Sequence, residues 1–208
     1  MTMTDGERAL LELMTGNKRY VAGKPVHPNQ SFDRRQETVE GQNPFATILT
    51  CSDSRVPPDI IFDQGIGDLF VIRVAGNIAG NSVIASAEYA AEHLSVPLLM
   101  VLGHTRCGAV TATIQGGNAP GRIGWLCEAI QPAVERARRM PGELLGNAVV
   151  ANVALTVERL SASVILGGLA RENRLKIAGA IYNLNSGAVE VIGGSQDAAQ
   201  QEDRDERM

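Results

Sequence analysis

The chain has little of what marks several large protein classes. Of its 208 residues only three are cysteine, three are histidine and 4% are aromatic, and the formal net charge is −4. No apolar run approaches the roughly 20 residues that a helix needs to cross a bilayer. No basic excess supplies the electrostatic field that attracts nucleic acid. We therefore expect a soluble globular protein that binds neither a membrane nor a nucleic acid.

Three of the six cysteine and histidine residues lie in two short segments. One is Cys51-Ser-Asp-Ser-Arg-Val-Pro-Pro and the other is Gly103-His-Thr-Arg-Cys107. Zinc binds cysteine sulfur and histidine nitrogen, which makes Cys51, His104 and Cys107 candidate ligands. A closed structural site needs a fourth such residue, but the remaining ones have no recognisable ligand spacing; they are Cys127, His27 and His93. The sequence therefore favours an open site, whose fourth position is left to water or substrate.

A carboxylate and a guanidinium accompany the first candidate ligand. Asp53 and Arg55 are two residues apart, so their side chains leave an extended or turning backbone on the same side. Without Cys51 nearby, such a pair would be interpreted as an ordinary surface ion pair. Beside a metal site, it is a candidate catalytic dyad.

Cysteine usage and the N-terminus indicate the same compartment. If two of the three cysteines bind metal, Cys127 has no free partner for a disulfide within the chain. The first eight residues lack the basic start, apolar centre and cleavage site of a secretory signal. We therefore expect a cytoplasmic location.

The apolar pattern predicts an α/β fold with a mostly parallel sheet flanked by helices. Buried strands are predicted at 45–50, 68–74 and 97–103, and helical spacing at 81–95 makes the last two a βαβ unit. The candidate ligands Cys51 and His104 then lie at the C-terminal ends of two strands, which is where open parallel sheets bind ligands. Cys107 precedes a predicted helix at 108–115, whose positive N-terminal end favours a thiolate.

The remaining elements complete a prediction of one domain over 1–194. Helices are predicted at 6–22, 34–40, 125–139 and 144–160, the third with a kink or break at Pro132, and the first two form an N-terminal arm within 1–40. A fourth strand is predicted at 163–167 and a hairpin at 176–192. The polar, acidic tail 195–208 predicts disorder.

Together these motifs resemble the signature of the β-class carbonic anhydrases. The similarity includes the stretch 63–77, the segment Ser86-Ala-Glu-Tyr-Ala90, and most of the chain from about residue 10 to residue 193. The resemblance implies a lyase (carbonate dehydratase) that converts carbon dioxide reversibly to bicarbonate, with one Zn²⁺ per chain. It also implies a homodimer or a higher even homo-oligomer, in which the N-terminal arm packs on a partner subunit.

The resemblance also assigns residues to a substrate pocket. It implies that Gln42 donates a hydrogen bond to the substrate, that Phe70 and Tyr89 form pocket walls, and that Gly108 contacts the substrate, with part of this set coming from the neighbouring subunit. From the sequence alone, Phe70 and Tyr89 could equally be core aromatics. Gln42 could be a surface loop residue.

Two details of the motif bear on regulation and pH dependence. Asp53 would accept the hydrogen of zinc-bound hydroxide while Arg55 holds it, or would fill the fourth zinc position if Arg55 released it. Arg73 matches an anion-binding position of a bicarbonate-inhibited subgroup, but that subgroup has tryptophan where this chain has Ile48. We therefore expect the open arrangement, with Arg73 in an interface or a buried ion pair. Because two thiolates lower the effective charge of zinc, activity should rise with pH.

Two other functions use the same residues. Carbonyl sulfide or carbon disulfide hydrolysis needs the same zinc-activated water and differs in pocket shape. A non-catalytic zinc- or bicarbonate-sensing module would be expected to have lost the dyad, and Asp53 and Arg55 are both present.

Overall fold

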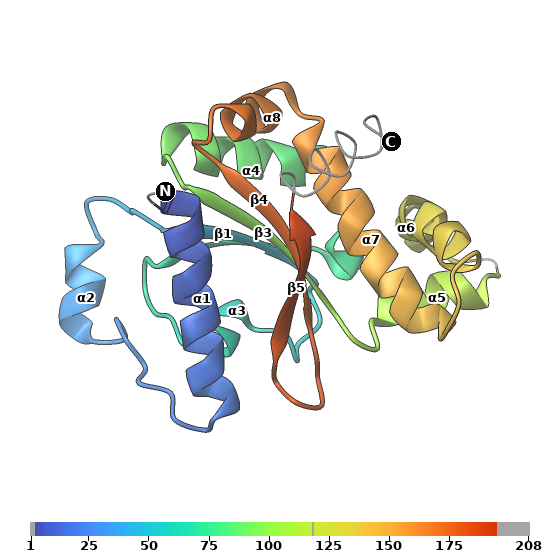
Figure 1. Ribbon diagram of the computed structural model, residues 1–208, viewed down its shortest axis with the longest axis horizontal. Coiled ribbons are helices and arrows are strands. Elements are labelled where there is room, and N and C mark those ends of the chain that lie inside the picture. Colours follow the sequence, from blue (N-terminus) through green and yellow to red (C-terminus); the bar gives the residue numbers. More distant parts are fainter. Residues whose placement is uncertain (1–2, 118, 195–208) are drawn as a thin grey trace, which may run out of the picture.

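A mostly parallel sheet of five strands forms the centre of the computed structural model, which describes residues 3–117 and 119–194 (Figure 1). The strand order is β2-β1-β3-β4-β5, and only β5 runs antiparallel to its neighbour. The strands are β1 (Ala46–Thr50), β2 (Leu69–Arg73), β3 (Leu98–His104), β4 (Lys176–Tyr182) and β5 (Val189–Gly194). The predicted α/β fold class, the first three strands and the hairpin are confirmed.

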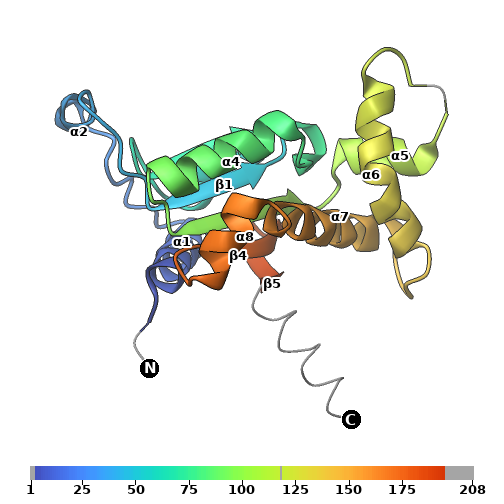
Figure 2. The ribbon, with the colours of Figure 1, turned by 90° about the horizontal axis from the view of Figure 1, so that it is seen from above.

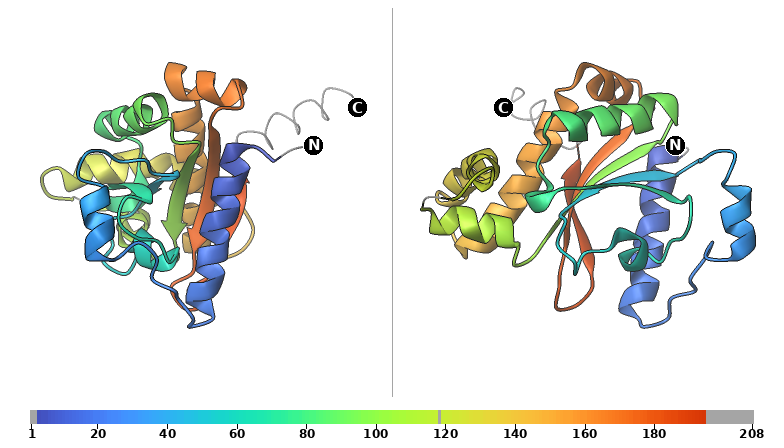
Figure 3. Two further views of the ribbon diagram at one scale, coloured as in Figure 1. Left: turned by 90° about the vertical axis from the view of Figure 1, so that its left-hand side faces the viewer. Right: turned by 180° about the vertical axis from the view of Figure 1, so that it is seen from behind.

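Helices cover both faces of the sheet. They are α1 (Asp5–Val21), α2 (Phe32–Glu37), α3 (Pro58–Ile61), α4 (Asn81–His93), α5 (Gly108–Gln115), α6 (Ile123–Ala137), α7 (Leu144–Ser161) and α8 (Val164–Arg171), with a short 3₁₀ turn, η1, at Ala75–Asn77. Figures 2 and 3 show α1 on one face of the sheet and α4 and α8 on the other. Helices α5 and α6 lie beyond the end of β3 from which α5 follows.

The two cores follow from the alternation of side chains along each strand. Ile48 and Met100 point to the α1 face and pack with Leu13 of α1. Their sequence neighbours Leu49 and Val101 point to the other face and pack against α4, α7 and α8. Strands β1 and β3 are buried along their whole length, which explains why they read as continuous apolar runs.

The N-terminal arm consists of two unequal parts. Helix α1 begins with a capping box between Thr4 and Glu7 and packs on its own sheet. Its buried Asn17 donates to the carbonyls of Ile61 and Gly187 at 3.1 and 2.9 Å, and accepts from the Val189 amide at 2.9 Å. Helix α2, in contrast, has no buried residue and stands apart from the sheet (Figure 1).

One predicted element was wrong, and of the kink or break predicted at Pro132 the break does not occur. Residues 163–167 do not form a strand but begin α8, where the Ser163 hydroxyl caps the helix by accepting from the Leu166 amide. A five-residue apolar run does not distinguish a buried strand from a helix. Helix α6 continues through Pro132 without the predicted break, because the carbonyl that loses its donor belongs to the exposed Glu128. The prediction also missed α3.

The predicted disorder of 195–208 lies outside the described residues. Among the described helices, none is by itself both long and apolar enough to cross a membrane, and only α7 and α8 taken together, with an 88° bend between them, meet those two criteria.

Candidate metal centre and active site

The site lies at a switch point of the sheet topology. From β1 the chain passes to β2 on one side and then to β3 on the other, so the connections diverge at the carboxyl ends of β1 and β3. Such switch points are where open parallel sheets bind ligands. Cys51 directly follows β1, His104 ends β3, and Cys107 is the N-cap of α5.

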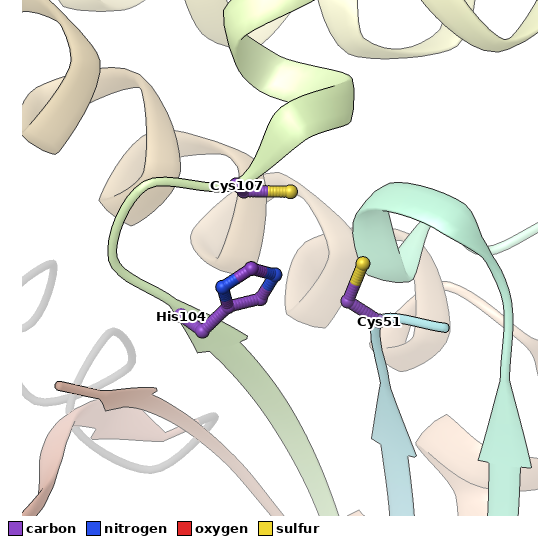
Figure 4. A group of neighbouring side chains, drawn as sticks. All are labelled: Cys51, His104 and Cys107. Atoms are coloured by element: carbon purple, nitrogen blue, oxygen red, sulfur yellow. The ribbon is translucent and has the colours of Figure 1, made fainter. Parts of the chain in front are cut away.

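The three predicted ligand residues converge at this switch point. The two sulfur atoms and a ring nitrogen of His104 all lie within 4.8 Å of one another, and the three side chains are buried (Figure 4). His104 Nδ1 is 3.0 Å from the carbonyl oxygen of Thr105, which favours a proton on Nδ1 and a lone pair on Nε2. Nε2 is buried without a hydrogen-bond partner among the described residues. An unpartnered nitrogen beside two sulfurs is what a metal ligand set requires.

The electrostatics of the two cysteines favour a thiolate. Hydrogen bonding from Cys107 lowers the pKa of Cys51 to about 4, and His104 and the amides of Gly76 and Asp53 act in the same direction against the effect of burial. The pKa of Cys107 is raised because its proton is held by Cys51 and because it is buried, while the amides of Val110 and Ala109 at the start of α5 oppose this. Both shifts favour one thiolate and one thiol in the pair, and a divalent cation bound there would displace the remaining proton.

A carboxylate stands next to the cluster in a fixed orientation. Arg55 donates to both oxygens of Asp53, from Nε at 2.9 Å and from a terminal nitrogen at 2.8 Å, and the Arg55 amide adds a bond at 3.0 Å. These contacts hold the pKa of Asp53 well below its usual range. Asp53 Oδ2 lies 3.9 Å from His104 Nε2. The predicted pair thus exists and faces the cluster.

Arg73 does not form the buried ion pair that was one of its two predicted roles. It is exposed, it forms no ion pair among the described residues, and its guanidinium donates to the carbonyls of Cys51, at 3.1 and 3.2 Å, and of Asp53, at 2.6 Å. It therefore ties the end of β2 to the turn that carries a candidate ligand and the carboxylate. The tryptophan position of the bicarbonate-inhibited subgroup is occupied by Ile48, which is fully buried in β1.

Two contacts to the cluster were missed by the sequence analysis. The Gly76 amide donates to Cys51 Sγ at 3.3 Å, and the side chain of the buried Asn152 donates to the Gly76 carbonyl at 2.8 Å. A signal for Asn152 was present in the sequence, because a lone asparagine interrupts the buried apolar residues of α7. Nothing in the sequence paired it with Gly76, which is 76 residues away.

Three of the four predicted substrate residues lie away from the cluster of their own chain. Gln42 is exposed in the loop before β1, and Phe70, near the start of β2, pairs with Thr47 rather than with the end of β1. The Phe70 and Tyr89 rings are neighbours, with centroids 6.3 Å apart, and Tyr89 is 48% exposed. A five-residue strand is about 17 Å long, and β1 separates Gln42 from Cys51. Only Gly108, exposed and next to Cys107, lies at the cluster.

The remaining cysteine is elsewhere. Cys127 lines a cavity of about 970 Å³ between α5 and α6, whose other lining residues include Trp125 and Glu128. None of the three clustered residues lines this cavity. Cys127 is therefore not part of the candidate centre, as its spacing predicted.

Comparisons with known proteins match the fold and the motif. Residues 46–189 match the family model described as carbonic anhydrase. The chain is 42% identical over 197 residues to carbonic anhydrase 2 of Mycobacterium tuberculosis, a match that covers 90% of this chain and 93% of that protein. It is 40% identical over 185 residues to a carbonic anhydrase of Mycolicibacterium smegmatis, with coverage of 86% and 89%.

A solved structure shares the fold. One of two tetrameric β-carbonic anhydrases from Sordaria macrospora superposes with a TM-score of 0.72 at 24% identity, covering 91% of this chain and 100% of that one. The family match spans more than half of the chain and includes every residue of the Cys51, His104 and Cys107 cluster. With two relatives at 40% identity or more, the chain belongs to the β-class carbonic anhydrases, a family of lyases.

Proposed function

We propose that this chain is a zinc-dependent carbonate dehydratase, which hydrates carbon dioxide reversibly to bicarbonate and a proton. The observation that carries the proposal is the buried cluster of two cysteine sulfurs and one imidazole nitrogen with an arginine-held carboxylate beside it. Two sulfurs and one nitrogen are a donor set that zinc accepts, and three protein ligands leave one position open.

The cluster would hold one zinc ion per chain. Cys51, Cys107 and His104 Nε2 are the donors, and the unpartnered Nε2 is the atom that most clearly fits a cation. A bound zinc ion supplies a Lewis acid that makes water a nucleophile near neutral pH. The other steps fall to the protein's own side chains.

Asp53 is suited to orient the attacking water rather than to act as a base. Arg55 keeps its carboxylate ionised, because the pKa of Asp53 is held low by the guanidinium. An ionised oxygen that faces the cluster accepts a hydrogen bond from the water. The water is thereby oriented with an oxygen lone pair directed at the carbon of carbon dioxide. A C–O bond then forms as one C=O π bond of carbon dioxide breaks, its electron pair passes to that oxygen, and the proton of the water is released to solvent.

The same contacts support the open arrangement. Both oxygens of Asp53 are engaged by Arg55, and Arg73 fixes the Asp53 carbonyl. For Asp53 to become a fourth ligand, the two bonds to Arg55 would have to break. The geometry thus favours a state in which the fourth position is free for water.

Stopped-flow measurement of carbon dioxide hydration tests the proposal. Protein of known zinc content should turn over carbon dioxide at a rate that rises from about pH 6.5 to 9, because two thiolate ligands lower the effective charge on zinc. Titration of Asp53 does not contribute to the pH dependence of the rate in this range, since the pKa of Asp53 lies below the range. Zinc-loaded protein without turnover at any pH would contradict the proposal, and carbonyl sulfide would then be the next substrate to assay.

We further propose that the working unit is a homo-oligomer with active sites shared between subunits. Gln42, Phe70 and Tyr89 lie away from the cluster of their own chain, and Tyr89 is half exposed. Helix α2 buries none of its residues, and large apolar side chains near it are exposed, including Phe32 and Val39, each at 66%. A partner subunit would cover this surface and receive these residues beside its own cluster.

Mixing two inactive variants tests the shared site. Gln42→Ala should lower turnover by removing a donor to substrate, and Cys107→Ser by removing a ligand. When the two are unfolded together and refolded, half of the dimers are mixed, and one site in each mixed dimer is intact. Activity should therefore return to about a quarter of the wild-type value. No recovery above the separate variants, although native mass spectrometry shows mixed dimers, would place Gln42 outside the partner's site.

A further inference from the structure

The Gly76 residue is held from two sides at the metal centre. Its amide donates to Cys51 Sγ at 3.3 Å, and its carbonyl accepts from Asn152 Nδ2 at 2.8 Å. Gly76 lies in η1, directly after β2, whereas Asn152 is in the middle of α7 and is 4% exposed. The hydrogen bonds from Asn152 to Gly76 and from Gly76 to Cys51 therefore link a buried helix to one candidate ligand.

Only glycine fits at this position. Gly76 has φ 67°, in the left-handed region, and a Cβ atom there would lie 2.7 Å from Ile130 Cδ1 and 3.2 Å from Ala109 Cβ. The same freedom of rotation that glycine supplies leaves the direction of its amide poorly determined by the local backbone. An external hydrogen bond is needed to fix it, and Asn152 is the side chain that makes one.

An amide that donates to a cysteine sulfur withdraws electron density from it. Outer contacts of this kind tune how strongly a ligand donates to its metal, and hydrogen bonds to sulfur set the potentials of iron–sulfur clusters in the same way. The effect matters here because two of the three ligands are thiolates, which together neutralise the formal charge of a divalent ion.

We propose that Asn152 is a positioning residue, which holds the Gly76 amide against Cys51 Sγ and so limits the electron donation of that sulfur to the bound metal. This inference rests on the proposed metal centre and extends it from the ligands to a side chain on α7. Among the described residues, Asn152 has no hydrogen bond to Cys51, and its link to that sulfur runs through Gly76.

The test replaces Asn152 by leucine, which has a similar volume, carries no charge and donates no hydrogen bond. The protein is loaded with Co²⁺, whose thiolate-to-metal charge-transfer absorption reports the energy of the sulfur electrons. In Asn152→Leu this band should move to longer wavelength, because a sulfur that loses an N–H donor releases its electrons more easily.

Asn17→Leu is the matched control. Asn17 is an equally buried asparagine, also donates to backbone carbonyls, and lies on α1 away from the cluster. It should lower the melting temperature without moving the cobalt band. If Asn152→Leu does not fold, Asn152→Ala gives the same comparison.

The outcomes separate this inference from the proposed function. A cobalt band that stays in place in folded Asn152→Leu overturns the inference, whatever the wild type does with carbon dioxide. A shifted band supports it, even if the wild type shows no hydration and the proposed reaction fails. A wild type that binds Co²⁺ without any charge-transfer band overturns both, because no thiolate would then be a ligand.

Discussion

Replacing Cys107 by serine should remove most of the bound zinc and, with it, the hydration of carbon dioxide. Cys107 is 1% exposed, and its sulfur is one of only three donor atoms in the cluster. A serine hydroxyl is a far poorer ligand for zinc than a thiolate at neutral pH. Loss of an outer-shell partner already costs 10- to 100-fold in affinity or activity, so we expect turnover to fall by more than about 100-fold.

Cys127→Ser is the control for this experiment. Cys127 is a half-buried cysteine that lines the cavity between α5 and α6, and its loss should leave zinc content and turnover unchanged. Metal content by atomic emission and turnover by stopped flow are measured on the same preparations. If Cys107→Ser retained one zinc per chain, Cys107 would not be a zinc ligand. The site of three ligands with an open fourth position would then be wrong.

Replacing Asp53 by alanine should abolish most turnover while leaving the zinc in place. The carboxylate is adjacent to the cluster but is held by Arg55 and is not one of the three donors. Without it, nothing orients the attacking water, and Arg55 is left with an uncompensated charge. The turnover number should fall by about 10²- to 10³-fold, the range typical of losing one preorganised hydrogen-bonding group in an active site, and Asp53→Asn, which keeps one acceptor oxygen, should lose less.

The chain offers a second acid with an arginine two residues later. Glu172 and Arg174 form an exposed pair at 3.2 Å, between α8 and β4, so Glu172→Ala removes the same kind of contact away from the site. It should leave turnover at the wild-type level. Full turnover in Asp53→Ala with normal zinc content would show that the carboxylate has no part in the reaction.

The local features of this protein were readable from its sequence. The strands β1 and β3 are apolar along their length, and α4 has apolar residues at helical spacing, so short-range patterns specified them. Cys51, His104 and Cys107 were predictable as a set because zinc accepts few residue types and the chain has few of them. Their placement at strand ends followed from the parallel sheet. In 163–167 the same reasoning failed, because a short apolar run fits a helix and a strand equally well.

Contacts between distant segments were not readable. Asn152 donates a hydrogen bond to Gly76 across 76 residues of sequence. Arg73 donates a hydrogen bond to the carbonyl of Cys51, and no pattern of side chains indicates where that carbonyl lies. Phe70 and Tyr89 were assigned to a pocket by resemblance, yet in one chain they contact each other near the start of β2 rather than the cluster.

The sequence by itself determined which side chains are suited to bind a metal, because this suitability depends on residue type and on spacing within a few residues. The tertiary structure alone decided how they are oriented. The proton on His104 Nδ1 is favoured by the Thr105 carbonyl, and the Gly76 amide is directed by a helix from the other half of the chain. Orientation depends on hydrogen bonds to backbone amides and carbonyls. Every residue carries these groups, so the sequence does not single out any of them, and only the fold decides which side chain meets which backbone group.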